Sequence, residues 1–142
     1  MKKMFVLMTA IVALITFDVN AKGITVPAAV KSALAKKYPV AASAKVTWEK
    51  EKGNYEANWG GKSGEDMSVQ FTPGGTFIEQ VQAIAITELP ATVTAYVKEH
   101  YKGMQIKEAG KVTDAKGTTM WEAEVKGKDL VFDKDGKFLK ID

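Results

Sequence analysis

The side chains best suited to acid–base or nucleophilic chemistry are few in this sequence, and they form no familiar catalytic set. His100 is the only histidine, and the chain contains no cysteine. A catalytic triad needs a nucleophile, a histidine base and an orienting acid, and transition-metal sites usually combine several histidine or cysteine ligands. His100 lies near the end of a predicted helix, where a positive charge is favourable in itself. The sequence therefore predicts a protein that is not an enzyme and that binds no metal or cofactor.

Two further segments contain the residue types of ligand-binding loops but not the spacing that such loops require. Residues 133–136 (Asp-Lys-Asp-Gly) resemble the start of a calcium loop, but the third spaced ligand and the closing glutamate of an EF-hand are missing. Residues 60–64 (Gly-Gly-Lys-Ser-Gly) contain the residue types of a phosphate loop in the wrong arrangement. We interpret the first as a hairpin turn, because Gly75 occupies the position of Gly136 in an earlier copy of the same pattern, and the second as a flexible loop.

Composition and charge indicate a globular protein without a nucleic-acid partner. Of the 142 residues, 46% are hydrophobic and 26% are charged, and the formal net charge is +3. All the basic side chains other than His100 are lysines. Arginine is the usual bidentate reader of phosphate and guanine, and here it is absent, while acidic residues are interleaved with the lysines. These features argue against nucleic-acid binding despite a pI of about 9.0.

The first 21 residues have the layout of a secretory signal peptide. Lys2 and Lys3 precede an apolar run over residues 4–17, and Val19 and Ala21 supply small or modest residues before a cleavage point. The apolar run is shorter than the roughly 20 residues that a membrane-spanning helix needs. The pattern predicts cleavage after Ala21 and a periplasmic or secreted protein, with no membrane insertion after cleavage.

The remaining chain is an internal duplication, with copies over residues 22–83 and 84–142. Superposing Pro27 on Pro90 also places Tyr38 on Tyr101. Farther along, one common offset relates two sets of residues: Phe71, Gly75 and Phe77 in the first copy, and Phe132, Gly136 and Phe138 in the second. Because these residue types recur in one order, the chain is expected to contain two equivalent structural units.

Each unit is predicted to be one helix followed by four antiparallel strands. Apolar residues at helical spacing follow Pro27 and Pro90, and residues then alternate with period two, with a tight reversal predicted at Gly53-Asn54. The fold class is therefore α+β, a tandem α-β-β-β-β duplication whose strands join one sheet with both helices on one face. The predicted core comprises Val46, Trp48, Tyr55, Trp59, Val69, Phe71, Trp121, Val125, Leu130 and Phe132.

The same alternation points a set of polar side chains away from the helices. We expect this second face to be open to water, so that its carboxylates would lack the dry cleft that general acid–base catalysis requires. A solvated polar face of this kind also discourages aggregation. As candidate binding residues on this face, the sequence offers Glu49, Glu51, Glu56, Asn58, Gln70, Glu122 and Glu124.

The second copy resembles a known family. The strand-turn-strand pattern over residues 121–139, together with Leu89-Pro90 opening a helix that ends at Tyr101, is similar to the PepSY-like, β-lactamase-inhibitor-like group of exported bacterial proteins. The resemblance implies a concave sheet with helices behind it and a non-enzymatic part in binding or inhibition. In the inhibitor for which the fold is named, the exposed sheet face is rich in aromatic contacts, whereas here that face carries glutamates.

These observations favour a non-enzymatic binding module that binds or inhibits an unknown protein or peptide of the cell envelope. The contact could involve the sheet face, the loops or an exposed edge strand. The alternative is an exported protein that binds a small ligand or a cation through its outward carboxylates. A hydrolase with an unrecognised site is a third possibility, and broad substrate panels would test it.

Overall fold

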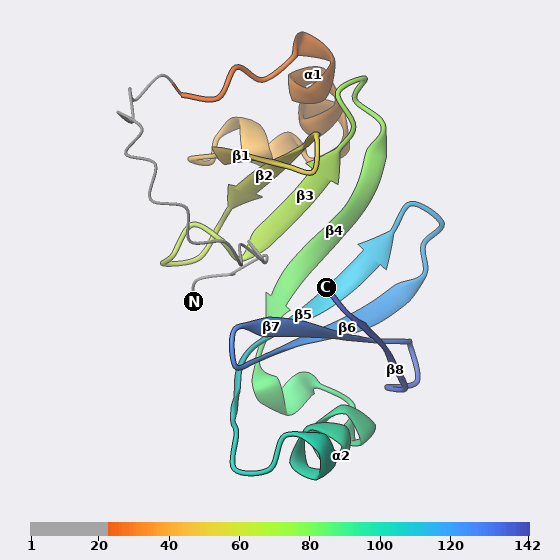
Figure 1. Ribbon diagram of the computed structural model, residues 1–142. Coiled ribbons are helices and arrows are strands. Elements are labelled where there is room, and N and C mark those ends of the chain that lie inside the picture. Colours follow the sequence, from red (N-terminus) through yellow and green to blue (C-terminus); the bar gives the residue numbers. More distant parts are fainter. Residues whose placement is uncertain (1–22) are drawn as a thin grey trace, which may run out of the picture.

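A computed structural model describes residues 23–142, and the predicted signal peptide lies outside this range. Two α-helices, two short 3-10 helices and eight strands follow one another in the order expected of a duplicated unit (Figure 1). The elements are α1 (Ala28–Lys37), η1 (Pro39–Ala42), β1 (Thr47–Glu51), β2 (Asn54–Trp59), β3 (Met67–Phe71), β4 (Phe77–Ile84), η2 (Ile86–Glu88), α2 (Ala91–His100), β5 (Ile106–Asp114), β6 (Thr119–Val125), β7 (Lys128–Phe132) and β8 (Phe138–Ile141). No helix in this part of the chain is long and apolar enough to cross a membrane.

All eight strands belong to one antiparallel sheet in the order of the sequence, β1 to β8. The two halves join where β4 pairs with β5, from Glu79 opposite Asp114 to Ile84 opposite Ala109. These two strands are the longest of the sheet, with eight and nine residues, because they pair with each other as well as within their own units. The sheet is therefore continuous across the duplication.

Each α-helix begins directly after a proline and buries one stripe of apolar residues. Pro27 and Pro90 are extended and precede the first helical turn, since proline lacks the N–H that helix interiors require. Val30 and Leu34 of α1 are buried, and Val93 of α2 has no exposed surface. Pro39 ends α1 and opens η1, as expected for a residue that disfavours helix in its predecessor.

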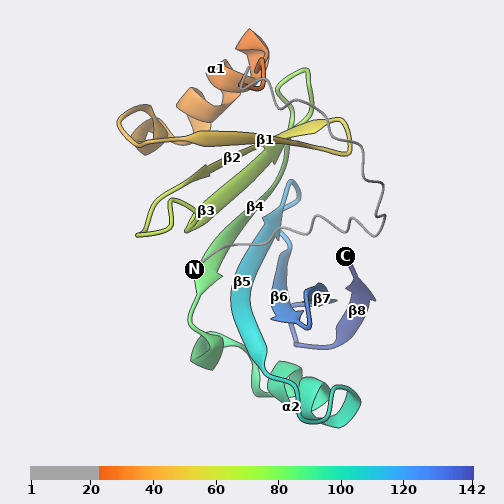
Figure 2. The same ribbon diagram turned by 60° about the vertical axis from the view of Figure 1, so that its left-hand side comes forward.

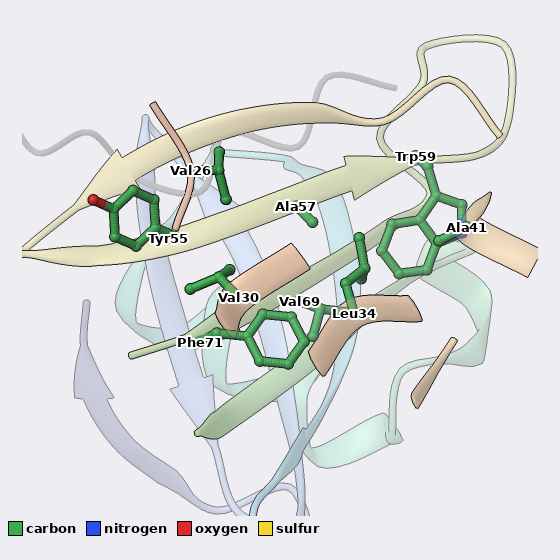
Figure 3. Packing of buried hydrophobic residues seen from close by; sticks show 9 residues of the cluster. All are labelled: Val26, Val30, Leu34, Ala41, Tyr55, Ala57, Trp59, Val69 and Phe71. Atoms are coloured by element: carbon green, nitrogen blue, oxygen red, sulfur yellow. The ribbon is translucent and has the colours of Figure 1, made fainter. Parts of the chain in front are cut away.

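The pairing registers place both helices on the same face of the sheet. Cross-strand partners point to the same face, and successive residues alternate. Trp48, Ala57, Val69 and Gln80 are successive cross-strand partners on β1 to β4, and Gln80 pairs with Thr113 of β5. All five side chains therefore point to the same face of the sheet. Figure 3 shows Val30 and Leu34 of α1 packing onto side chains of this face, which come from β2 and β3. The helix-facing side of the sheet forms the core.

The core consists of two clusters, one under each helix. Of the predicted core residues, seven are buried and the remaining three, Val46, Trp48 and Trp121, are partly buried against the clusters. Tyr38 and Tyr101, at the ends of the helices, also pack against their respective clusters. The ring of Tyr38 meets that of Trp59 edge-on, with centroids 5.3 Å apart. The two tyrosines therefore serve as core packing at helix ends.

The first hairpin turns one residue earlier than the sequence pattern predicts. Lys52 and Gly53 form the reversal, with φ of 48° and 81°, and Asn54 pairs with Glu51 as part of β2. Positive φ at both central positions is the requirement of a type I′ turn, whose twist matches that of the strands it connects. Lys126 and Gly127 repeat this turn between β6 and β7.

Gly75 and Gly136 hold equivalent turns against the starts of the two helices. Both have a positive φ, 84° and 81°. A Cβ atom on Gly75 would lie 2.6 Å from the carbonyl oxygen of Ala29 in α1, and one on Gly136 would overlap the hydroxyl of Thr92 in α2. The glycine recurs in both copies because the backbone conformation and the close approach of a helix each exclude a side chain.

We expect Gly75→Ala to destabilise the fold more than Gly53→Ala. Both residues have nearly the same positive φ, so each substitution should cost about 1–2 kcal/mol of backbone strain, but a Cβ atom on Gly53 has no neighbour within 4 Å. The added clash with α1 should make the Gly75 variant less stable by at least about 1 kcal/mol more. Urea denaturation of both variants measures the difference, and equal midpoints with equal slopes would contradict the packing argument.

Candidate functional site

On the face opposite the helices, cross-strand pairing arranges polar and some apolar side chains in rows that run across several strands. One row joins Glu49, Glu56, Gln70, Glu79 and Asp114, from β1 through β5. A second row joins Thr47, Asn58, Ser68, Val81 and Val112. A third crosses the second half of the sheet through Ala83, Gly110, Glu122, Val131 and Lys140. We call this surface the helix-free face.

The sheet twists and bends so that its two ends approach each other over this face, and Figure 2 shows the turn of the strands between β1 and β5. Lys52, in the β1–β2 turn, lies 3.7 Å from Asp142, directly after β8. Asp142 and Lys140 also lie close enough to Glu79 of β4 to influence its ionisation. Because the Lys52–Asp142 ion pair is exposed to water, it contributes little to stability. Its short distance nevertheless shows that the two ends of the sheet lie close together. The helix-free face is therefore concave.

The structure points all seven candidate residues to this face, but it buries three of them. Glu49 is exposed, and Glu51, Gln70 and Glu122 are partly exposed. Glu56 is only 2% exposed, and Asn58 and Glu124 are also buried. The expectation of a face open to water is wrong for these three residues, because the bent sheet brings neighbouring rows and strand ends over its centre.

Buried polar groups at the centre of the face are joined by hydrogen bonds. The amide nitrogen of Gln70 donates to carboxylate oxygens of Glu56 and of Glu51, each at 3.2 Å. On the next row, the hydroxyl of Ser68 donates to the side-chain oxygen of Asn58. Buried polar groups without partners are costly, and these bonds offset part of that cost. They also hold the side chains in fixed positions, so the centre of the face is pre-organised.

Burial raises the pKa of Glu56 to about 7. The hydrogen bonds from Gln70 and Asn58 oppose this rise, while the nearby carboxylates of Glu51 and Glu49 add to it. Burial also raises the pKa of Glu51 and of Glu79, and Asp142 adds to the rise in each case. Glu51, Glu56 and Glu79, on β1, β2 and β4, therefore each hold a proton to higher pH than an isolated glutamate does.

Sequence reasoning missed part of this face. Glu79 and Lys140 line it, and Asp142 reaches its rim, yet none was among the candidates. Its middle is also apolar, because Val81, Val112 and Val131 point to it and are buried. The alternation over residues 77–84 could have identified Glu79 as outward, but the approach of residue 142 depends on the bend of the whole sheet.

His100 and residues 133–136, which carry side chains capable of chemistry, lie at a helix end and in a hairpin turn. His100 is the last residue of α2, which packs on the other side of the sheet, and its ring contacts that of Tyr96 with centroids 4.1 Å apart. Residues 133–136 form the β7–β8 turn, in which Asp133 accepts hydrogen bonds from the N–H groups of residues 135 and 137. Within residues 23–142, no three histidine, cysteine or acidic side chains are grouped to hold a metal ion.

Glu56→Gln should stabilise the protein at high pH. A pKa raised from 4.5 to about 7 means that the folded state binds the proton more tightly than the unfolded state does. This contribution to stability is complete below pH 4.5 and is lost as the pH rises through 7. Each tenfold difference in proton affinity corresponds to about 1.4 kcal/mol, so the loss is on the order of 3 kcal/mol.

The glutamine variant should lose less stability than the wild type over this range, by on the order of 3 kcal/mol, since its side chain keeps its shape and carries no charge. The raised pKa values of Glu51 and Glu79 affect both proteins alike. Urea unfolding at pH 4.5 and pH 8.5 measures the effect, and Glu99→Gln, on the exposed surface of α2, is the control. A wild-type protein and a Glu56→Gln variant that lose the same stability between the two pH values would show that Glu56 is not the titrating group.

Comparison with known proteins gives a consistent family assignment. The family model described as "Putative beta-lactamase-inhibitor-like, PepSY-like" matches twice, over residues 16–79 and 67–140. No curated protein matches the chain at a significant level.

Several solved structures share the fold. A protein from Bacteroides eggerthii, described among "putative periplasmic proteins", is 21% identical, with 84% of this chain and 89% of that one covered and a TM-score of 0.67. A DUF2874 family protein from Bacteroides ovatus is 25% identical over 84% and 89% of the two chains, with a TM-score of 0.65.

A BLIP-like protein from Bacteroides fragilis is also 25% identical, over 84% of this chain and 88% of that one, with a TM-score of 0.61. The twice-repeated family match agrees with the two helix-plus-four-strand units. The chain therefore belongs to the PepSY-like, β-lactamase-inhibitor-like family.

Proposed function

We propose that this chain is a non-enzymatic, exported binding module that binds a protein or peptide of the cell envelope on the helix-free face of its sheet. The observation that carries the proposal is the hydrogen-bonded centre of that face, where Gln70 bridges Glu51 and Glu56. A surface whose polar groups are already fixed loses little conformational entropy when a partner binds. The export signal predicted over residues 1–21 and the periplasmic description of a structural neighbour support the location.

The charge of the face favours a basic partner. The chain as a whole has a net charge of +3, yet the row through Glu49, Glu56, Glu79 and Asp114 is acidic, and Glu122 lies on a neighbouring row. Acidic groups gathered on a concave surface attract lysine and arginine side chains and speed their association. A β-lactamase-type inhibitor would instead be expected to carry aromatic contact residues here.

The exposed carboxylates, rather than the buried ones, are suitable for a binding test. Lysine at position 56 or 124 would bury an unpaired cation and unfold the protein. Glu49→Lys combined with Glu122→Lys reverses charge at two sites that retain solvent exposure. Glu88→Lys combined with Glu99→Lys makes the same change in net charge on exposed positions of η2 and α2, away from the face.

The experiment immobilises residues 22–142 and exposes them to cell-envelope extract, after which each captured protein is purified and its Kd is measured. The Glu49/Glu122 variant should bind at least about tenfold more weakly, equivalent to 1.4 kcal/mol, and the control variant should bind like the wild type. Equal weakening in both variants would show that net charge causes the effect and would contradict binding on the helix-free face.

Calcium separates this proposal from the alternative of a cation-binding protein. A ligand that binds only the folded state raises the melting temperature in proportion to its saturation of the site. If the helix-free face serves protein partners, millimolar calcium should leave the melting temperature unchanged. A saturable calcium-dependent rise that disappears in the Glu49/Glu122 variant, together with no captured protein, would replace the binding-module proposal with the cation-binding one.

A further inference from the structure

In the described part of the chain, the outer edge of β1 lacks a neighbouring strand that its counterpart in the second unit, β5, has. Within residues 23–142 no strand pairs with that edge, because β1 is the first strand of the sheet and its only partner is β2. The equivalent strand of the second unit, β5, has partners on both sides, β6 and β4. The first unit therefore lacks the strand that β4 supplies to the second.

The backbone groups at this edge are arranged to accept a strand. Glu51 and Asn54 flank the two-residue turn and pair with each other, so their N–H and C=O groups can only bond across the hairpin. In an antiparallel ladder this orientation alternates along the strand. Trp48 and Lys50 therefore point their N–H and C=O groups away from β2, toward the outer edge, and their side chains toward the face that α1 covers.

A groove of about 320 Å³ lies beside this edge, between α1, η1 and β1. Small or apolar side chains line most of it, including Leu34, Ala35, Ala41 and Trp48, and Lys31 is the only charged residue in the lining. In the second unit the corresponding space is occupied. Ile84 of β4 pairs with Ala109, the counterpart of Trp48, and packs against the cluster under α2.

We propose that the β1 edge and its groove form a second binding site, which accepts an extended partner peptide as a ninth antiparallel strand. The peptide would place an apolar side chain opposite Trp48, in the groove, as Ile84 of β4 is placed opposite Ala109. Main-chain hydrogen bonds would supply affinity and the groove would select the side chain. The site is separate from the helix-free face and does not depend on the function proposed for that face.

Charge indicates which peptides the site accepts. Lys31 lines the groove, Lys50 points to the same face, and α1 contains three lysines and no acidic residue. The peptide residue two positions before the apolar one would lie opposite Lys50, as Gln82 lies opposite Lys111 in the second unit. An acidic residue at that position complements the lysines. The charged side chains of Glu49 and Lys50 also discourage indiscriminate pairing along the edge.

The probe is a fluorescent peptide with the sequence of residues 78–86 of this chain and the substitution Gln82→Glu. It carries the side chains of β4 and places an acidic residue opposite Lys50. Fluorescence anisotropy should show saturable binding to residues 22–142. The same peptide with Ile84→Lys should bind at least about tenfold more weakly, because it would place a charge in the apolar groove.

Two pairs of protein variants test the site itself. Lys50→Pro removes the outward N–H without touching the β1–β2 ladder, as edge prolines can, while Lys50→Ala removes only the side chain. The proline should weaken binding at least about tenfold more than the alanine does. Ala35→Trp fills the groove from an exposed helix position and should also abolish binding, whereas Ala95→Trp on α2 should not.

Circular dichroism and melting temperature verify that each variant is folded. No saturable binding of the probe to the folded wild-type protein, or equal binding by the wild type, Lys50→Pro and Ala35→Trp, would overturn the proposal. Sedimentation tests the competing occupant, a second copy of this chain. A wild-type dimer that Lys50→Pro converts to monomer would replace the partner peptide with self-pairing, and a monomeric wild type supports the peptide.

Discussion

The pairing of β4 with β5 is the constraint on which the rest of the structure depends. It consists of six residue pairs between two strands that belong to different copies of the repeat. Because side chains alternate along a strand, this single register decides which residues of the second unit share a face with those of the first. A slip of one residue would turn the apolar side of the second unit away from α2 and expose it. The observed register instead aligns the two apolar sides, so that both helices cover one face and both clusters of the core form beneath them.

The other face takes its properties from the bend of the continuous sheet. A flat sheet would leave Glu56, Asn58 and Glu124 in water, where they would be ordinary polar residues. The bend encloses them, and it brings Asp142, which follows β8, close to Lys52 in the β1–β2 turn. Burial without a cationic partner then raises the pKa of Glu56 to about 7, so the acidity of this face changes within the physiological range. The buried carboxylate costs folding free energy, which its hydrogen bonds and its protonation offset.

Duplication has produced two units with different surroundings. The first strand of the second unit, β5, has a neighbour on each side, β4 and β6, whereas β1 has only β2 among the strands of residues 23–142. The first unit ends at β1, beside a groove that Lys31 and several alanines line. Charge is divided in the same way, with lysines on α1 and carboxylates on the concave face of the sheet. A chain of modest net charge thereby presents two surfaces of opposite sign.

The sequence by itself determined the elements and their faces. Period-two alternation identified the apolar side of each strand, including Phe71 and Phe132, because burial on one face of a sheet selects alternate residues. Glycines at 75 and 136 identified the turns, because only glycine fits a positive φ against a helix. Only the tertiary structure decided how exposed the polar side chains are. The burial of Glu56, the approach of Asp142 and the open edge of β1 depend on how far the whole sheet bends and on which strand it lacks, and no local pattern of residues encodes those long-range distances.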